Sequence, residues 1–296
     1  ARKSPPSAPP PFTARPSPPN HGAKGRDMAQ APSPLTISVT EGLHRLLDGP
    51  PAPDRLAAAL RQLAKWRSAL LDNTLAARNG TTVLAGPFAG MAYPVRAAEG
   101  ARAARLLGAY EASLEPVIDT IAARPYAQVI DIGCAEGYYA VGLARRMPQA
   151  RVLARDTSAA AQDLCRTLAQ ANGVADRVQV GGLFTHADFA LCLAAPTVVI
   201  CDIEGAEADL LDPAAAPGLT AADILVEVHE GMRPGLLAEL TARFAPSHRI
   251  TRIDRTLRPD RLPPWAEDLS DLDRLLLLWE WRAAPTPWLW METLHP

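Results

Sequence analysis

Hydrophobic and polar residues follow two different rhythms along the chain, and the first covers residues 35–123. Leucines and a tryptophan between residues 54 and 78 recur at spacings of three and four, which predicts one long amphipathic helix. Residues 99–123 repeat this spacing and predict a second helical region. Between the two, the β-rich runs 81–84 and 91–95 flank a glycine-rich turn and predict a β-hairpin. We therefore expect a helical and β-hairpin cap.

From residue 124 to residue 296, short β-rich runs alternate with helical stretches. Seven strands are predicted, over residues 128–132, 151–155, 177–180, 197–202, 223–228, 248–253 and 275–281. Apolar strands with helices between them predict an α/β domain whose mainly parallel sheet is covered by helices on both faces. Ligands bind such sheets outside the carboxyl ends of the strands. The residues that end these strands are therefore the first candidates for function.

The first 34 residues differ from the rest of the chain in composition. They are crowded with proline, poor in large apolar residues and locally basic. A segment that buries so little apolar surface cannot offset the entropy of ordering it, so we expect a disordered leader over residues 1–34. A ligand for an SH3-type domain or for an anionic surface is one alternative, and a linker is the interpretation that we favour.

Charge, hydropathy and cysteine usage narrow the class of protein. The 30 Lys and Arg residues nearly balance the 32 Asp and Glu residues, whereas a dedicated nucleic-acid binder needs a basic face. The longest aliphatic run, from Leu275 to Leu278, is far shorter than the roughly 20 apolar residues of a membrane span. The four cysteines show no CxxC spacing, which favours free buried thiols in a reducing compartment. We therefore expect a cytoplasmic protein that binds neither nucleic acid nor membranes.

The sharpest motif is the segment VIDIGCAEGYY, which begins at Val129. A buried strand carries Asp131, passes through the Gly-x-x-x-Gly turn of Gly133 and Gly137, and opens a helix at Tyr138. Glycines allow a tight turn and close approach of a ligand, and the helix start presents free N–H groups. Neither the GxGxxG fingerprint of dinucleotide-binding folds nor a GxxxxGK[ST] phosphate loop is present.

This turn resembles motif I, hDhGxxxG, of the class I S-adenosylmethionine-dependent methyltransferases. The resemblance implies a Rossmann-like fold and S-adenosylmethionine as cofactor. Asp156 follows the second predicted strand, where a carboxylate can bind both ribose hydroxyls. Asp131 and Glu136 lie where carboxylates would meet the methionyl amino group, and the Tyr138 ring either contacts the cofactor or packs in the core. The cofactor-binding residues implied in this way are Asp131, Gly133, Ala135, Glu136, Gly137, Tyr138 and Asp156.

Two later segments narrow the resemblance. ICDIEGAE, residues 200–207, and ILVEVHE, residues 224–230, are similar to paired segments of the FkbM-type methyltransferases, and GYYAVGLA, residues 137–144, is similar to the helix of that family. The similarity covers roughly residues 106–255. It implies methylation of a small-molecule hydroxyl as the activity. N-methylation and a non-catalytic subunit that binds S-adenosylmethionine remain alternatives.

Acidic residues and a histidine gather at the ends of the fourth and fifth predicted strands. Asp202 and Glu204 follow the fourth strand, and Glu227 and His229 end the fifth. A hydroxyl acceptor must lose its proton as the methyl bond forms, so His229 or Asp202 is the expected general base. A divalent cation on Asp202, Glu204 and His229 is an alternative that we do not predict. Capping of the next helix by glutamates is a purely structural alternative.

Aromatic residues before motif I and near the C-terminus are further candidates. Tyr110 and Glu111 either reach over the donor or form a packed tyrosine and a solvated glutamate. Trp279 and Trp281 fall in the last predicted strand and are expected in the core. Trp288 and Trp290 lie beyond it, where they line an acceptor pocket, form a subunit contact or pack the tail on the sheet. A homo-oligomer is therefore left open.

Overall fold

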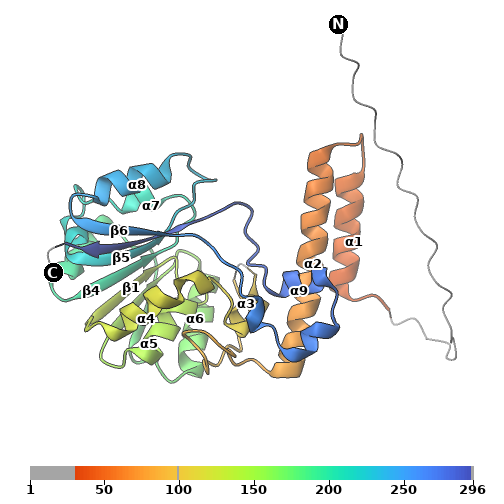
Figure 1. The fold of residues 1–296 in the computed structure, drawn as a ribbon, viewed down its shortest axis with the longest axis horizontal. Helices are drawn as coiled ribbons and strands as arrows, with labels where there is room; N and C mark the ends of the chain where they lie inside the picture. Colours follow the sequence, from red (N-terminus) through yellow and green to blue (C-terminus); the bar gives the residue numbers. More distant parts are fainter. Residues whose placement is uncertain (1–30, 99, 295–296) are drawn as a thin grey trace, which may run out of the picture.

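The computed structural model describes residues 31–98 and 100–294 (Figure 1). The predicted leader lies outside these residues except for its last four. Of these, Pro34 begins helix α1, Pro34–Leu47, and Ser33 caps it by accepting a hydrogen bond from the N–H of Thr36.

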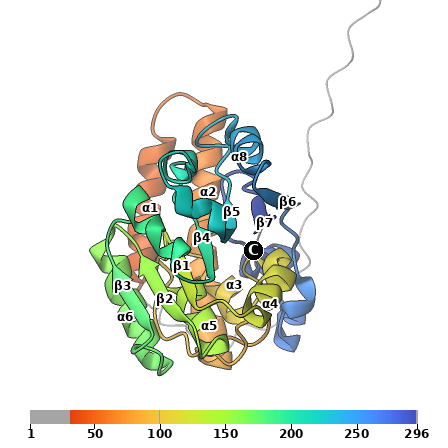
Figure 2. The same cartoon turned by 90° about the vertical axis from the view of Figure 1, so that its left-hand side faces the viewer.

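One seven-stranded sheet forms the centre of the molecule (Figures 1 and 2). Its strands are β1 Gln128–Ile132, β2 Arg151–Arg155, β3 Val178–Gly181, β4 Thr197–Cys201, β5 Ala222–Glu227, β6 His248–Ile253 and β7 Trp288–Thr293. Their order is β3-β2-β1-β4-β5-β7-β6, and only β7 runs antiparallel to its neighbours. The sheet confirms the predicted fold class, and the strand order reverses between β1 and β4.

Helices cover both faces of this sheet. Helices α4 Glu115–Ala123, α5 Tyr138–Arg146 and α6 Ala159–Ala171 pack on one face, against a core that includes Val129 and Val198. The other face is covered by η2 His186–Leu193, α7 Glu207–Leu210, η3 Pro217–Ala221 and α8 Leu236–Phe244. Because both faces are buried, the central strands β1, β4 and β5 read as apolar runs, which made them predictable from the sequence. Six of the seven strands, including the edge strands β3 and β6, were predicted to within one residue.

Helix α2, Pro53–Asn79, confirms the long helix predicted from the leucine spacing. It packs against α1 and against α9, Asp271–Leu277, so that the three helices stand together beside the sheet (Figure 1). Arg67 of α2 donates two hydrogen bonds of 2.7 Å to Asp273 of α9. The predicted cap therefore includes a C-terminal helix, and the boundary at residue 124 stays a prediction.

The segment between α2 and the sheet is less regular than its pattern indicates. The predicted helix over residues 99–123 is broken into α3 Arg102–Leu107, η1 Ala112–Leu114 and α4. Gly108 ends α3 with φ 68°, and a Cβ there would lie 2.0 Å from the carbonyl oxygen of Ala85. The predicted β-hairpin is reduced to a single antiparallel bridge between Thr82 and Ala92.

The strand predicted over residues 275–281 is wrong, because its first residues belong to α9. Ser270 caps that helix by accepting a hydrogen bond from the N–H of Asp273. The helix buries Asp273, Leu276 and Leu277 on one face and exposes Leu272 and Leu275 on the other. After the 3-10 turns η4 Pro259–Arg261 and η5 Pro264–Asp268 and helix α9, the chain returns to form β7 at Trp288. Trp288 and Trp290 are therefore sheet residues, whereas Trp279 and Trp281 stack on each other beside α2.

Glu136 connects the motif I turn to the segment that precedes it. Its side chain is fully buried and accepts hydrogen bonds from Tyr93 Oη at 2.6 Å and from the N–H of Ala98 at 2.9 Å. Its carboxylate also lies 3.0 Å from the guanidinium of Arg105, which is itself 4% exposed. These contacts hold α3 and the segment before it, from Tyr93 to Ala98, against the turn that follows β1.

Replacing Glu136 by glutamine should therefore destabilise the fold. The change leaves the Arg105 charge buried without a counter-charge, which typically costs about 3–5 kcal/mol of unfolding free energy. Urea unfolding followed by circular dichroism measures this loss. The control is Asp163→Asn, which removes an exposed ion pair with Arg166 and should keep the wild-type midpoint. Equal midpoints for both variants would contradict this role of Glu136.

Candidate active site

The turn after β1 makes a close crossing with the end of β4. Gly133 has φ 81°, and a Cβ at this position would lie only 1.7 Å from the carbonyl oxygen of Asp202. Ala135 follows in the left-handed region with φ 46°, and α5 begins at Tyr138. The turn predicted from the motif is thus present, and its first glycine is required by the contact with Asp202.

Asp156 stands directly after β2 and holds this turn in place. Its Oδ2 accepts a hydrogen bond from the N–H of Ala135 at 3.0 Å, and its Oδ1 accepts one from the N–H of Ser158 at 2.7 Å. It lines a cavity of about 370 Å³, which we call the Asp156 cavity, together with Gly133, Phe184 and Asp202. Polar groups thus lie at the turn, and apolar side chains lie across from them.

A second cavity, of about 420 Å³, opens at the ends of β4 and β5, and we call it the His229 cavity. Asp202, Glu227 and His229 form its floor. Its opposite side comes from α2, through Lys65, and from the loop that joins α9 to β7. Asp202 and Glu204 line both cavities, so the two spaces meet at the end of β4.

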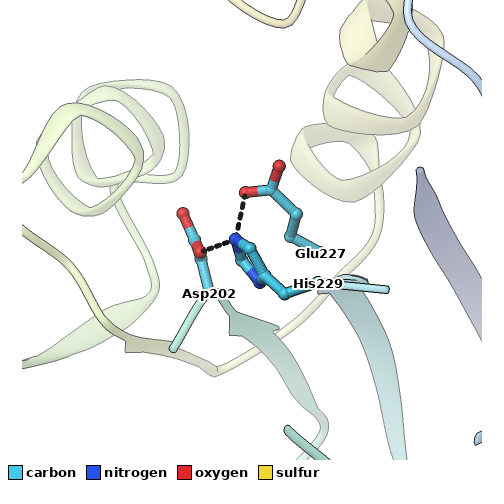
Figure 3. A group of neighbouring side chains, drawn as sticks. All are labelled: Asp202, Glu227 and His229. Atoms are coloured by element: carbon cyan, nitrogen blue, oxygen red, sulfur yellow. Dashed lines mark ion pairs between the residues drawn. The ribbon is translucent and has the colours of Figure 1, made fainter. Parts of the chain in front are cut away.

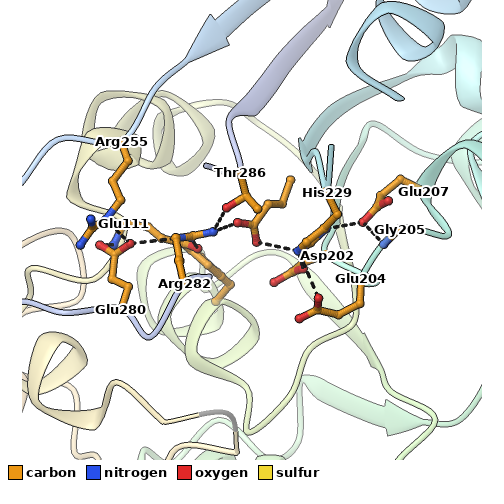
Figure 4. A network of polar contacts seen from close by, with 12 residues as sticks. Glu111, Asp202, Glu204, Gly205, Glu207, His229, Arg255, Glu280, Arg282 and Thr286 are labelled. Atoms are coloured by element: carbon orange, nitrogen blue, oxygen red, sulfur yellow. Dashed lines mark hydrogen bonds and ion pairs between the residues drawn. The ribbon is translucent and has the colours of Figure 1, made fainter. Parts of the chain in front are cut away.

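His229 is oriented by a buried glutamate. Its Nδ1 lies 2.6 Å from Oε1 of Glu207, a residue of α7 that also accepts from the N–H of Gly205 (Figure 4). Nε2 faces the other carboxylates, at 3.6 Å from Asp202, 3.5 Å from Glu204 and 3.9 Å from Glu227. The helix-capping alternative therefore holds only for Glu207, which both bonds Gly205 and orients His229.

These charges change the pKa values of the pair. Burial alone would lower the pKa of His229, but the hydrogen bond with Glu207 and the negative charges of Asp202 and Glu204 raise it above its ordinary value. Burial opposes ionisation of Glu207, but His229 and the N–H of Gly205 hold the pKa of this carboxyl below its ordinary value. The imidazole is thus a stronger base than a free histidine.

Asp202, Glu227 and His229 also form a group that could hold a metal ion (Figure 3). One ligand atom from each lies within 4.8 Å of the others, and Glu207 would orient the histidine as an outer-shell carboxylate. The sequence named Asp202 and His229 for this alternative but placed Glu204 where the structure has Glu227.

Arg282, which the sequence analysis did not identify, is the centre of a buried charge network (Figure 4). Its guanidinium pairs with Glu111, Glu227 and Glu280. Burial, together with the nearby Glu111 charge, raises the pKa of Glu280 to about 7. Glu111 is 4% exposed, so the alternative in which it is a solvated glutamate is wrong. No local pattern could show that the loop before β7 returns to this site.

Three further residues predicted to bind the cofactor, Asp131, Glu136 and Tyr138, lie at the motif I turn. Asp131 is buried and lines a narrow crevice together with Gly133 and Trp288. Burial raises the pKa of its carboxyl to about 7. The oxygens of Glu136 are occupied by the cap contacts described above. Tyr138 also lines the crevice, but its buried ring lies edge-on to that of Phe88, with the ring centroids 5.2 Å apart. This contact favours the interpretation that Tyr138 packs in the core.

Comparison with known proteins agrees with this architecture. Residues 114–196 match the family model of the methyltransferase small domain. Over 37 residues, 12% of this chain and 14% of the relative, the sequence is 60% identical to a trans-aconitate 2-methyltransferase of Deinococcus radiodurans. Over 60 residues, 20% of this chain and 19% of the relative, it is 43% identical to a release factor glutamine methyltransferase of Chlorobaculum tepidum. The chain thus matches less than a fifth of each curated relative's length.

Solved structures of methyltransferases are similar to this chain at low identity. The O-methyltransferase TomG of Streptomyces achromogenes is 14% identical with a TM-score of 0.42, over 60% of this chain and 78% of its own. An O-methyltransferase of Bacillus cereus is 12% identical with a TM-score of 0.38, over 90% of this chain and 93% of its own. These likenesses do not identify an acceptor.

Over residues 31–98 and 100–294, no helix is both long enough and apolar enough to cross a membrane.

Histidine titration tests the geometry around His229. We expect the pKa of His229 to lie above the ordinary value of about 6.5. The pKa of the buried His248 should lie below that value, because its desolvation prevails over its hydrogen bond to the carbonyl of Ala222. Glu207→Gln removes the anion and should lower the pKa of His229 while leaving that of His248 unchanged. NMR of the imidazole protons measures both, and a His229 pKa that does not respond to Glu207→Gln would contradict the pairing.

Proposed function

We propose that this protein is an S-adenosylmethionine-dependent methyltransferase that methylates a hydroxyl group of a small molecule. The observation that carries the proposal is the junction of the Asp156 cavity and the His229 cavity at Asp202. A transfer enzyme needs its donor and acceptor in adjoining spaces with the reacting atoms in line, an alignment worth on the order of 7–11 kcal/mol. The match to the methyltransferase small domain supports methyl transfer.

The Asp156 cavity fits the adenosine part of the donor. Gly133 lines this cavity, and its missing side chain lets the carbonyl of Asp202 lie against the turn. Asp156 offers carboxylate oxygens at the end of β2, where both ribose hydroxyls can donate to them, and Phe184 supplies an apolar wall. S-adenosylmethionine brings a methyl group on a sulfonium, and the turn leads from this cavity to the junction at Asp202.

The His229 cavity fits the acceptor. Glu207 orients the imidazole so that Nε2 faces the open space, where it can accept the proton of a hydroxyl as the oxygen–methyl bond forms. The surrounding carboxylates stabilise the imidazolium that results. Asp202, at the junction, is the second candidate for this proton transfer.

The resemblance to FkbM-type enzymes supports a hydroxyl acceptor. The segments that carry it, residues 200–207 and 224–230, contain the cluster at the ends of β4 and β5, including Asp202, Glu204, Glu227 and His229. An amine acceptor would arrive deprotonated and would need no base, whereas this cavity holds an oriented one. We therefore favour O-methylation over N-methylation and over a non-catalytic subunit.

Asp156→Asn tests the donor site. The variant keeps an oxygen for the N–H of Ala135 but loses the charge and one of the oxygens offered to the ribose. We expect about tenfold weaker binding of S-adenosylhomocysteine by titration calorimetry, in line with the loss of a charged hydrogen bond. Asp163→Asn, on the exposed side of α6, should bind like the wild type. Unchanged affinity of Asp156→Asn would remove this residue from the site, and lack of binding by the wild type would refute the proposed cofactor.

His229→Gln tests the base. Turnover with an accepted alcohol should fall by about 10²–10⁴-fold with little change in donor affinity. In the wild type, kcat/KM should rise with pH through a pKa above 6.5, because only neutral imidazole accepts a proton. His44→Gln, an exposed residue of α1, is the control. If a chelator abolished turnover and Mg²⁺ restored it, Asp202, Glu227 and His229 would be metal ligands, and the base assignment would be wrong.

A further inference from the structure

Negative and positive charges lie on opposite sides of the His229 cavity. The floor carries His229 and the carboxylates that surround its Nε2. The side formed by α2 carries two half-buried cations, Arg61 and Lys65. These residues are four apart and therefore lie on the same face of the helix, one turn from each other. A ligand that fills this cavity thus meets anions at one end and cations at the other.

Arg61 and Lys65 differ from Arg282, the third cation of the cavity, in that no carboxylate neutralises them. Arg282 pairs with three glutamates in the network described above. Within residues 31–98 and 100–294, neither Arg61 nor Lys65 forms an ion pair with an acidic side chain, and both contact tryptophans instead. Like charges four residues apart on a helix destabilise each other. An anion bound between them would remove this repulsion.

Trp281, in the loop before β7, holds both cations at the cavity. Arg61 Nη2 donates a hydrogen bond of 2.8 Å to the carbonyl of Trp281, and Lys65 Nζ lies 4.8 Å from the centroid of the Trp281 ring. Trp281 is fixed in turn, because its indole N–H donates to Ser68 Oγ at 3.2 Å. Its φ of 63° is a strained value for a bulky residue, and such strain persists only where the surroundings impose it.

We propose that Arg61 and Lys65 bind an anionic group of the acceptor, a carboxylate or a phosphate, so that the substrate is a hydroxylated acid. This inference rests on the proposed function, because it takes the hydroxyl to lie at Nε2 of His229. The carboxylates of the floor repel an anion, whereas α2 attracts it. The acceptor therefore binds in one orientation, with its hydroxyl toward His229 and its anionic group toward α2.

The two side chains supply complementary donors for such an anion. A guanidinium has five N–H groups, and the carbonyl of Trp281 takes only one hydrogen bond from that of Arg61. The ammonium of Lys65 is a compact charge with three donors. Hydrogen bonds from either cation to a carboxylate or a phosphate are charge-assisted, and these are the strong ones in proteins. The pair thus adds affinity for the acid end of the acceptor and selects against neutral alcohols.

The test compares probes that differ only in the anionic group. Para-hydroxybenzoate and para-hydroxyphenyl phosphate carry a hydroxyl and an anion, whereas para-hydroxybenzamide carries the hydroxyl and a neutral group of similar shape to the carboxylate. We expect calorimetry on the wild-type enzyme saturated with S-adenosylhomocysteine to show at least tenfold tighter binding of one anionic probe than of the amide. The anion that binds more tightly identifies the group that the site takes.

Arg61→Gln and Lys65→Gln should each weaken that anionic probe about tenfold and leave the affinity for the amide unchanged. Arg78→Gln is the matched control. Arg78 lies exposed on the same helix and also stacks on a tryptophan, with its guanidinium carbon 4.7 Å from the ring centroid of Trp265, but it does not line the His229 cavity. This variant should bind all three probes like the wild type.

Equal affinity of the wild type for the anions and the amide, or no binding of either anion, would overturn the inference, and neither result depends on a variant that folds. Equal losses for anion and amide in Arg61→Gln and Lys65→Gln would overturn it as well, because they would assign the cations a structural role. Failure of the wild type to bind S-adenosylhomocysteine would instead refute the proposed function, so the two failures are distinct.

Discussion

The contact between the backbone of Gly133 and the carbonyl of Asp202 is the constraint on which the site depends. An added Cβ would lie 1.7 Å from that oxygen, so only glycine lets the turn after β1 press against the end of β4. This crossing lies where the strand order reverses, between β1 and β4. It brings Asp202 to the edge shared by the Asp156 cavity and the His229 cavity. The adjacency of the two cavities therefore follows from the sheet topology together with one residue without a side chain.

Buried charges then shape what the site can do. The Arg105–Glu136 pair joins α3 to the motif I turn, and Arg282 holds the loop before β7 against Glu111 and Glu227. Buried ion pairs add little net stability, because desolvation offsets their attraction, but breaking one is costly. Their effect here is positional: they fix the walls of the crevice and of the His229 cavity and keep carboxylates around an imidazole that Glu207 orients.

The parts predicted from the sequence are those that local pattern determines. Six strands, the long helix α2, the motif I turn and the convergence of Asp202 with His229 follow from apolar runs, helical spacing and residues at strand ends. Long-range contacts determine the parts that were missed. An aliphatic run near residue 275 suits a strand or a helix, and Ser270 and Asp273, with the packing of α9 on α2, select the helix. Arg282 and Trp288 reach the site only because the chain leaves the sheet after β6 and returns.

A crystal structure of the protein with S-adenosylhomocysteine tests the central claim most directly. The account predicts adenosine in the Asp156 cavity, the sulfur at the junction beside Asp202, and the Nε2 atom of His229 facing that sulfur across the open His229 cavity. Bound S-adenosylhomocysteine outside the Asp156 cavity, or a sulfur separated from His229 by protein, would contradict it.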